Sequence, residues 1–187
     1  MTTVIPEPIG TARLLLVPIG PGHADELAGV LSDPALYTFT GGIPLSRQAL
    51  RDRYERLAAG SPDPHVTWGN WSIKVRSAGR LAGYVQATIT AGQAGETGET
   101  GEAGGDPEPG PVAEVAWVVG TAWQGQGLAT EAARALADWL GRHGVTTVIA
   151  HIHPDHHASA AVAAAAGLSP TSDWHDGERR WRRVMAP

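Results

Sequence analysis

The 187-residue sequence contains no cysteine. This absence excludes disulfide bonds, thiolate metal sites and a cysteine nucleophile. Long apolar runs are also missing, and none approaches the roughly 18 consecutive apolar residues that predict a membrane-spanning helix. The N-terminal segment has no basic flank and carries Pro6 and Pro8, so it does not resemble a secretory signal. Together these absences predict a cytoplasmic protein without a membrane partner.

The sequence also has little excess charge. Its 14 basic and 19 acidic residues give a formal net charge of −5, which provides no general attraction for nucleic acid. One local exception is an arginine-rich segment in which Arg179, Arg180, Arg182 and Arg183 surround Trp181. We interpret it as the solvated face of a terminal strand, and the alternative is a contact with an anionic substrate or a partner.

The residues that are present predict a single α/β domain over 1–187. A content of 42% hydrophobic and 18% charged residues is typical of a globular protein. Strands are expected at 13–18, 68–75, 81–89, 112–119 and 145–151 and in a last hairpin at 174–185, and helices at 23–31, 46–59, 127–142 and 156–166. The pattern predicts a mixed, largely antiparallel central sheet of roughly six to seven strands flanked by about four helices.

The segment Ala91 to Pro111 differs from the rest of the chain. It repeats Gly-Glu-Thr and contains no large apolar residue. Such a segment cannot bury enough surface to offset the entropy cost of ordering it, so we predict a flexible loop between two strands of one sheet.

The most informative stretch is Gln124 to Thr130, with the sequence QGQGLAT. It follows a predicted strand and opens a predicted helix, whose start offers unpaired backbone N–H groups and a positive dipole end. Because glycines also allow close approach, a pyrophosphate is the expected ligand, and a tight turn without a ligand is the alternative. A P-loop would need a lysine here, and a dinucleotide fingerprint would need glycine or alanine in place of Thr130.

Two blocks resemble the GNAT acetyltransferases. Gln124 to Ala129 is similar to the Q/R-x-x-G-x-G/A signature of that family, between the expected strand and helix. In a second block, His156, Ser159, Ala163 and Gly167 occupy the places of the family's Asn, Ser or Ala, Tyr and Gly. His156 in place of Asn weakens an expected contact with pantetheine. Ala163 in place of Tyr removes a residue that is often the general acid in the family.

The opening of the chain extends the resemblance. Thr11 to Pro18 and Leu31 to Pro34 resemble the branch that acetylates ribosomal-protein N-termini and related amines. The resemblance implies a GNAT fold, acetyl-CoA as cosubstrate and an amine acceptor, and it leaves a homodimer open. The cofactor-binding residues that it implies are Val118, Val119, Gln124, Gly125, Gln126, Gly127, Leu128, Ala129, Thr130 and His156.

The resemblance also suggests which residues carry the chemistry. Glu114 stands at the start of the strand before the glycine loop and is the candidate general base, with a solvent-facing strand residue as the alternative. Ser159 is the candidate proton donor to the leaving thiolate, with a hydroxyl bonded to local backbone as the alternative. A backbone N–H of Val118 or Val119 would stabilise the oxyanion. Without cysteine, direct attack in a ternary complex is favoured over a covalent enzyme.

A histidine cluster suggests another class of enzyme. His151 to His156 matches H-x-H-x-D-H, the dinuclear-metal signature of metallo-β-lactamase-fold hydrolases. That fold needs further ligands downstream, and His175 is the only histidine after His157. We therefore predict no bound metal and a histidine-rich turn at the mouth of the cofactor cleft. The leading function is an N-acetyltransferase; a non-catalytic acyl-CoA-binding module and a metal-dependent hydrolase are the alternatives.

Overall fold

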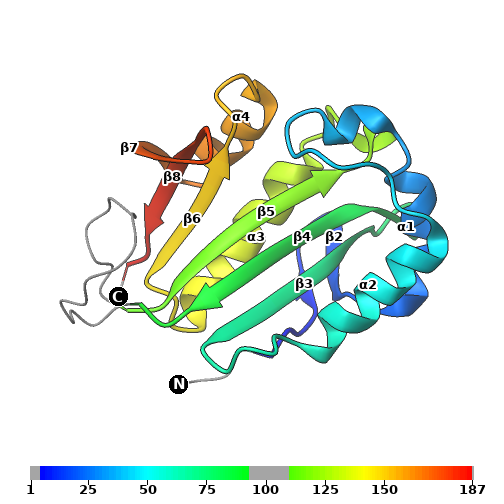
Figure 1. Cartoon of the computed structure of the whole chain (residues 1–187), viewed down its shortest axis with the longest axis horizontal. Coiled ribbons are helices and arrows are strands. Elements are labelled where there is room, and N and C mark those ends of the chain that lie inside the picture. The colour runs from blue at the N-terminus through cyan, green and yellow to red at the C-terminus, as the bar shows by residue number, and fades with distance from the viewer. Residues whose placement is uncertain (1–4, 93–109, 187) are drawn as a thin grey trace.

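The computed structural model describes residues 5–92 and 110–186 (Figure 1). The predicted flexible loop at 91–111 lies mostly outside the described residues, so that prediction stays untested. No helix in the described ranges is long and apolar enough to cross a bilayer.

The described strands form one sheet in the order β1-β2-β3-β4-β5-β6-β8-β7. Neighbouring strands are antiparallel except β5 and β6, which are parallel. The strands are β1 (Ile9–Gly10), β2 (Leu14–Pro18), β3 (Val66–Val75), β4 (Arg80–Thr90), β5 (Val112–Val119), β6 (Thr147–Ile152), β7 (Ser169–His175) and β8 (Glu178–Val184). The helices are α1 (Ala24–Val30), α2 (Arg47–Ala59), α3 (Leu128–Arg142) and α4 (His157–Ala165), with short 3₁₀ turns at Pro21–His23, Pro34–Tyr37 and Thr121–Trp123.

This architecture confirms the predicted mixed, largely antiparallel fold. The eight-stranded sheet slightly exceeds the expected count, because β1 is too short to produce an alternating pattern. The predicted hairpin at the chain end is present as β7 and β8. Its turn residues Asp176 and Gly177 have φ values of 49° and 80°, and positive values at both positions are typical of a tight hairpin turn.

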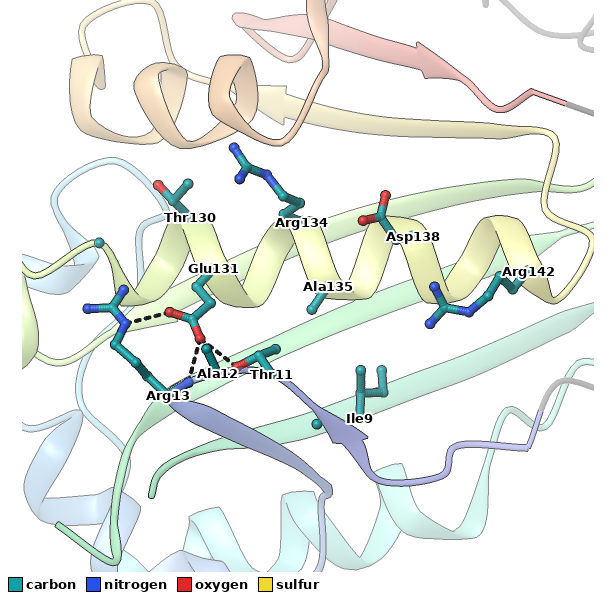
Figure 2. A pocket seen from close by; sticks show the side chains of 12 residues that line it. Ile9, Thr11, Ala12, Arg13, Thr130, Glu131, Arg134, Ala135, Asp138 and Arg142 are labelled. Carbon is teal, nitrogen blue, oxygen red and sulfur yellow. Dashed lines mark hydrogen bonds and ion pairs between the residues drawn. The ribbon is translucent and has the colours of Figure 1, made fainter. Parts of the chain in front are cut away.

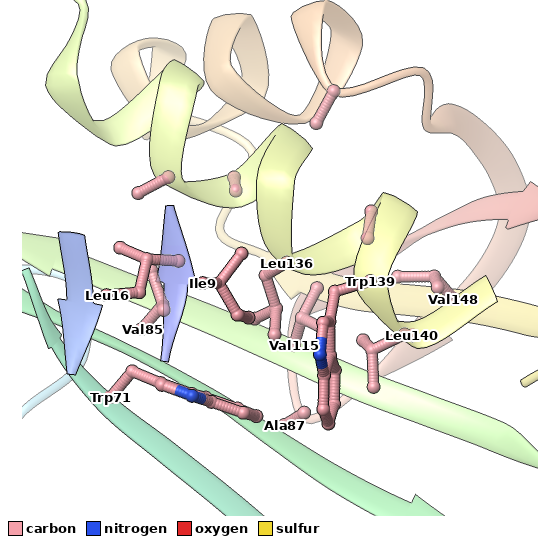
Figure 3. Close-up of a cluster of buried hydrophobic side chains, with 14 of the residues drawn as sticks. Ile9, Leu16, Trp71, Val85, Ala87, Val115, Leu136, Trp139, Leu140 and Val148 are labelled. Atoms are coloured by element: carbon pink, nitrogen blue, oxygen red, sulfur yellow. The ribbon is translucent and has the colours of Figure 1, made fainter. Parts of the chain in front are cut away.

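One face of the sheet packs against α3 (Figure 3). Leu128, Ala132, Leu136 and Leu140 follow one another at intervals of four and form its buried stripe. The indole of Trp139 meets that of Trp71 from β3 edge-on, with ring centroids 5.2 Å apart. Such a pair contributes about 0.5–1.5 kcal/mol beyond its area burial. This layer therefore fixes α3, and with it the loop at its N-terminus, on the sheet.

Helices α1 and α2 form a second apolar cluster at the β3–β4 side of the sheet. Leu27 from α1, Leu50 and Tyr54 from α2, and Leu81 from β4 are buried in it. Val118 from β5 packs against its edge. Helix α2 begins after Ser46, whose hydroxyl oxygen accepts a bond from the Ala49 N–H at 3.2 Å, as an N-cap does. Helix α1 contacts β4 and helix α2 contacts β3, and both helices lie on the side of the molecule away from β6 (Figure 1).

The parallel strands β5 and β6 separate after their first residues. Pairing extends only from Val112↔Thr147 to Glu114↔Ile149, although β5 continues to Val119 and β6 to Ile152. Figure 1 shows the two strands diverging toward their carboxyl ends. Open α/β sheets bind ligands where neighbouring connections diverge at the carboxyl ends of strands.

Candidate active site

A cleft of about 790 Å³ lies where β5 and β6 diverge. This volume falls within the range of about 300–1,000 Å³ that is usual for ligand sites. Residues from the ends of both strands, the starts of α3 and α4, and the segment before α2 line it, among them Phe39, Val119, Gln124, Gly127, His151, Ser159 and Glu178. Of the predicted cofactor residues, all but Gln126 line the cleft; of the predicted catalytic residues, Ser159 lines it and Glu114 does not.

The glycine loop presents backbone donors to the cleft. Gly125 and Gly127 have φ values of 72° and 74°, a conformation that glycine adopts without steric cost. Among the described residues, no acceptor takes the backbone N–H groups of 125–130, and the first helical backbone bond runs from Glu131 to the Gly127 carbonyl at 3.1 Å. Unpaired N–H groups and the positive end of the α3 dipole together favour an anion.

Side chains from outside the loop hold its shape (Figure 2). Arg13, just before β2, donates from Nη1 to the Gln126 carbonyl at 2.8 Å and from Nε to the Glu131 carboxylate at 2.6 Å. Thr11 donates its hydroxyl to the same carboxylate at 2.6 Å. On the other side, the Gln124 amide donates to the Val119 carbonyl at 3.0 Å. The start of the chain and the end of β5 therefore both fix this loop.

The Glu131 carboxylate is ionised in this arrangement. Burial alone would raise its pKa, but the hydrogen bonds from Thr11 and Arg13 outweigh burial, and the pKa is lowered. A second depression of about 570 Å³ adjoins the loop on the β1 side, where the carboxylate of Glu131 is paired with Arg13 and that of Asp138 with Arg183. Most of its charged groups have partners, since Arg134 also donates to the Ala165 carbonyl, whereas the N–H groups of 125–130 have none in the described chain.

The backbone of β5 also faces the cleft at alternate residues. The Gly120 N–H bonds to Ala82 on β4 at 2.9 Å, and the Val119 carbonyl points the other way, to Gln124. Because successive residues of a strand direct their backbone groups to opposite sides, Trp117 and Val119 direct theirs away from β4. Val119 is thus better placed than Val118 to offer an N–H to the cleft.

Glu114 is hydrogen-bonded to His151 of β6. The two residues lie on the same sheet face, and His151 Nδ1 is 2.8 Å from Glu114 Oε1. The hydrogen bond lowers the pKa of Glu114 and raises the pKa of His151, and it outweighs the partial desolvation that opposes each shift. The His151 side chain is 15% exposed and that of Glu114 is 51% exposed. Of the two, only the imidazole lines the cleft.

The α4 end of the cleft carries Ser159 and His156. Within the described chain the Ser159 hydroxyl makes no hydrogen bond, so it is available to a ligand. The His156 ring stacks on Phe39, with centroids 4.5 Å apart, and the His153 ring lies 5.2 Å from Phe39. Burial, followed by the neighbouring His153, lowers the pKa of His156 and keeps it neutral. Phe39 thereby connects the segment before α2 to the turn after β6.

The histidines do not converge as metal ligands. Across residues 5–92 and 110–186, no group of three or more His, Asp or Glu side chains could hold a metal ion. His151 faces Glu114, whereas His153 and His156 contact Phe39.

Three features of the cleft did not follow from the sequence. They are the pairing of Glu114 with His151, the position of Glu178 in the cleft lining, and the contact of Phe39 with the histidine turn. Each brings together residues that are distant in the chain. Strand alternation could have placed Glu114 and His151 on one face, if the β5–β6 register had been known. No local pattern around Phe39 or Glu178 indicates their partners.

A divergent pair of parallel strands with a donor-rich loop before a helix suits a ligand that carries a diphosphate group. The sequence matches the acetyltransferase (GNAT) domain over residues 13–169. The chain therefore belongs to the GNAT acetyltransferases, enzymes that transfer acetyl groups from acetyl-CoA. A comparison with curated proteins finds no match.

Several solved structures share the fold. A GNAT-family acetyltransferase from Bacillus anthracis is 16% identical with a TM-score of 0.70, and the match covers 96% of this chain and 99% of that one. RimL, a ribosomal L7/L12 alpha-N-protein acetyltransferase in complex with coenzyme A, is 17% identical with a TM-score of 0.71, covering 96% and 98%. The aminoglycoside acetyltransferase AAC(6')-Ib in complex with coenzyme A is 17% identical with a TM-score of 0.65, covering 91% and 94%.

Proposed function

We propose that this protein transfers the acetyl group of acetyl-CoA to a primary amine, on a protein N-terminus or a small molecule, by direct attack in a ternary complex. The observation that carries the proposal is the cleft itself, which joins free backbone donors at 125–130 to a titratable pair at Glu114 and His151. The first group suits the pyrophosphate and the second suits deprotonation of an amine.

In this proposal the cosubstrate is held mainly by backbone. The N–H groups from Gly125 to Thr130 bind the pyrophosphate, and the edge of β5 that faces away from β4, at Trp117 and Val119, lies along the pantetheine arm and the acetyl group. The neutral ring of His156, which stacks on Phe39, contacts the pantetheine arm as well. The oxyanion formed at the thioester carbonyl accepts a hydrogen bond from the Val119 N–H.

The proton transfers use side chains at the other end of the cleft. Glu114 supplies the carboxylate on which removal of the amine proton depends, and Ser159 gives a proton to the departing thiolate, directly or through water. An α-amine with an ordinary pKa of about 7.7–8.0 needs less help from a base than a lysine amine with a pKa of about 10.4. The same arrangement is therefore chemically suited to either, with a larger demand on the base for lysine.

An acetyl-CoA-dependent thiol-release screen tests the proposal. The panel contains peptides with free N-terminal Ala or Ser, polyamines, amino acids and aminoglycosides, each with its N-acetylated counterpart as control. We expect release with at least one free amine and none with its blocked form. Acetyl-CoA binding by calorimetry without turnover on any amine would instead favour the non-catalytic acyl-CoA-binding module. No binding would contradict both.

A further inference from the structure

We propose that His151 is the group that takes the proton from the acceptor amine, and that Glu114 acts through it as a positioning residue. This inference rests on the proposed acetyl transfer and assigns the proton acceptor within it. It replaces a carboxylate base by a carboxylate–imidazole pair, in which only the imidazole faces the cleft.

The geometry separates the two roles. Glu114 Oε1 lies 2.8 Å from Nδ1 of His151. An ionised carboxylate can only accept hydrogen bonds, so Nδ1 carries the hydrogen and the lone pair of the neutral ring is on Nε2. In the described chain Nε2 has no hydrogen-bond partner, and the ring lines the cleft together with Val119 and Ser159. The one basic nitrogen of the pair is therefore the unpartnered nitrogen of a ring that lines the cleft.

The surroundings of the ring suit a base that works near neutral pH. Glu114 from β5 raises the pKa of His151 through the hydrogen bond, burial opposes it, Glu178 on β8 raises it further, and Arg180 on β8 lowers it. The His175 ring of β7 lies 5.3 Å away. The net shift is upward, so His151 binds a proton more strongly than a free imidazole does.

The step balances as follows. The amine nitrogen attacks the thioester carbonyl carbon, and an N–C bond forms as the N–H proton passes to Nε2 of His151. The C–S bond breaks with its electron pair on sulfur, which takes a proton from water or from the Ser159 hydroxyl, and the hydroxyl then regains its proton from solvent. The imidazolium then gives its proton to solvent, while Glu114 keeps the ring in place through Nδ1.

The test compares pH profiles of kcat/KM for an acceptor found in the screen. The acceptor amine has its own pKa, which is measured separately, and its protonation causes kcat/KM to fall at low pH in every variant. Protonation of His151 should cause a second fall on the same acidic side, which is the second acidic limb of the profile. His151→Asn keeps a donor to Glu114 but cannot titrate, so we expect a loss of about 10²–10⁴-fold and the disappearance of the second acidic limb. Glu114→Gln should keep that limb but move it to lower pH, because the cause of the raised pKa is gone. His65→Asn, which removes an exposed histidine at the start of β3, is the matched control and should leave the profile unchanged.

Two further measurements make the test independent of one variant. The His151 ring, followed by NMR, should titrate above the ordinary histidine range and move down in Glu114→Gln. His151→Ala should regain activity with added imidazole, whereas Ser159→Ala should not. Retention of the limb in His151→Asn, or its loss in Glu114→Gln or Glu178→Gln alone, would overturn the inference while leaving acetyl transfer intact. Absence of transfer by the unmodified enzyme would instead defeat the proposed function.

Discussion

The two ends of the cleft are built in different ways. The loop end is a contiguous stretch, 124–130, that offers backbone N–H groups held by glycine conformations and the start of α3. The other end has side chains from separate strands, His151 on β6 and Glu178 on β8, with Glu114 on β5 behind His151. Backbone donors do not titrate near neutral pH, whereas the imidazole of His151, whose pKa is raised by Glu114, does. The loop end should therefore control affinity, and the strand end should control rate and its dependence on pH.

The largest effect on acetyl-CoA affinity at the loop end is expected from Gly127→Val. Gly127 has a φ of 74°, and a branched side chain there both strains the loop and blocks approach to its N–H groups. We expect the Kd for acetyl-CoA, measured by calorimetry, to rise about 10- to 100-fold, equivalent to about 1.4–2.8 kcal/mol.

Gly144→Val is the matched control. Gly144 has a φ of 84° and open space around its Cα, at the far end of α3. The two substitutions impose similar backbone strain, so Gly144→Val should lower stability and leave the Kd unchanged. Equal loss of affinity in both variants would mean that Gly127 acts only through folding.

A smaller effect, on rate and not on affinity, is expected from Ser159→Ala in the first turn of α4. Loss of the hydroxyl should lower kcat about tenfold, less than the usual general-acid effect of about 10²–10⁴-fold because water can also protonate the thiolate, and should leave the Kd for acetyl-CoA unchanged. Ser169→Ala, an exposed serine on β7, is the control. The deficit should shrink with an acyl thioester whose thiol is a better leaving group, because that thiolate needs no proton. A deficit independent of the leaving group would assign Ser159 to binding instead.

A smaller effect still should follow from Glu131→Gln, which tests whether the loop end depends on the start of the chain. The ion pair with Arg13 is partly exposed, so its loss should lower stability by about 0.5–1 kcal/mol and weaken acetyl-CoA binding about two- to fivefold. The folded pKa of Glu131 is lowered, so this stability is present above the ordinary glutamate pKa of about 4.3. It is lost as the pH falls through the folded value.

Glu26→Gln is the control for that variant, because Glu26 pairs with Arg80 away from the loop. It should lower stability in the same pH window without changing the Kd for acetyl-CoA. An unchanged Kd in Glu131→Gln would show that the loop keeps its shape without Arg13.

The same contrast explains what could be predicted from the sequence. The bounds of β5 and the start of α3 were predicted because each depends on a local pattern, apolar alternation and a glycine before a helical stripe. The glycine loop was predicted because its ligand-binding groups are contiguous backbone. The 3₁₀ turn at Pro34–Tyr37, which leads to Phe39, and the two-residue β1 have no such pattern and were missed.

The partner of Glu114 could not be predicted from local sequence patterns. His151 was considered as a metal ligand because its neighbours in the chain are histidines. Its neighbour in space is a carboxylate on β5, and that contact depends on a parallel register only three residue pairs long. Where function depends on a short pairing between distant segments, local patterns indicate the residues but not their partners.

The smallest expected effect is that of metal removal, and it tests whether the strand end works by titration alone. Protein purified without a polyhistidine tag should carry no stoichiometric zinc by elemental analysis, and a chelator should leave kcat/KM unchanged. The physical reason is that His151 already uses Nδ1 for Glu114, while His153 and His156 pack on Phe39. Binding zinc with these three rings would require them to leave both contacts and converge. Two tightly held equivalents per chain, lost together with activity, would show that they do so and would assign the histidines to a metal centre.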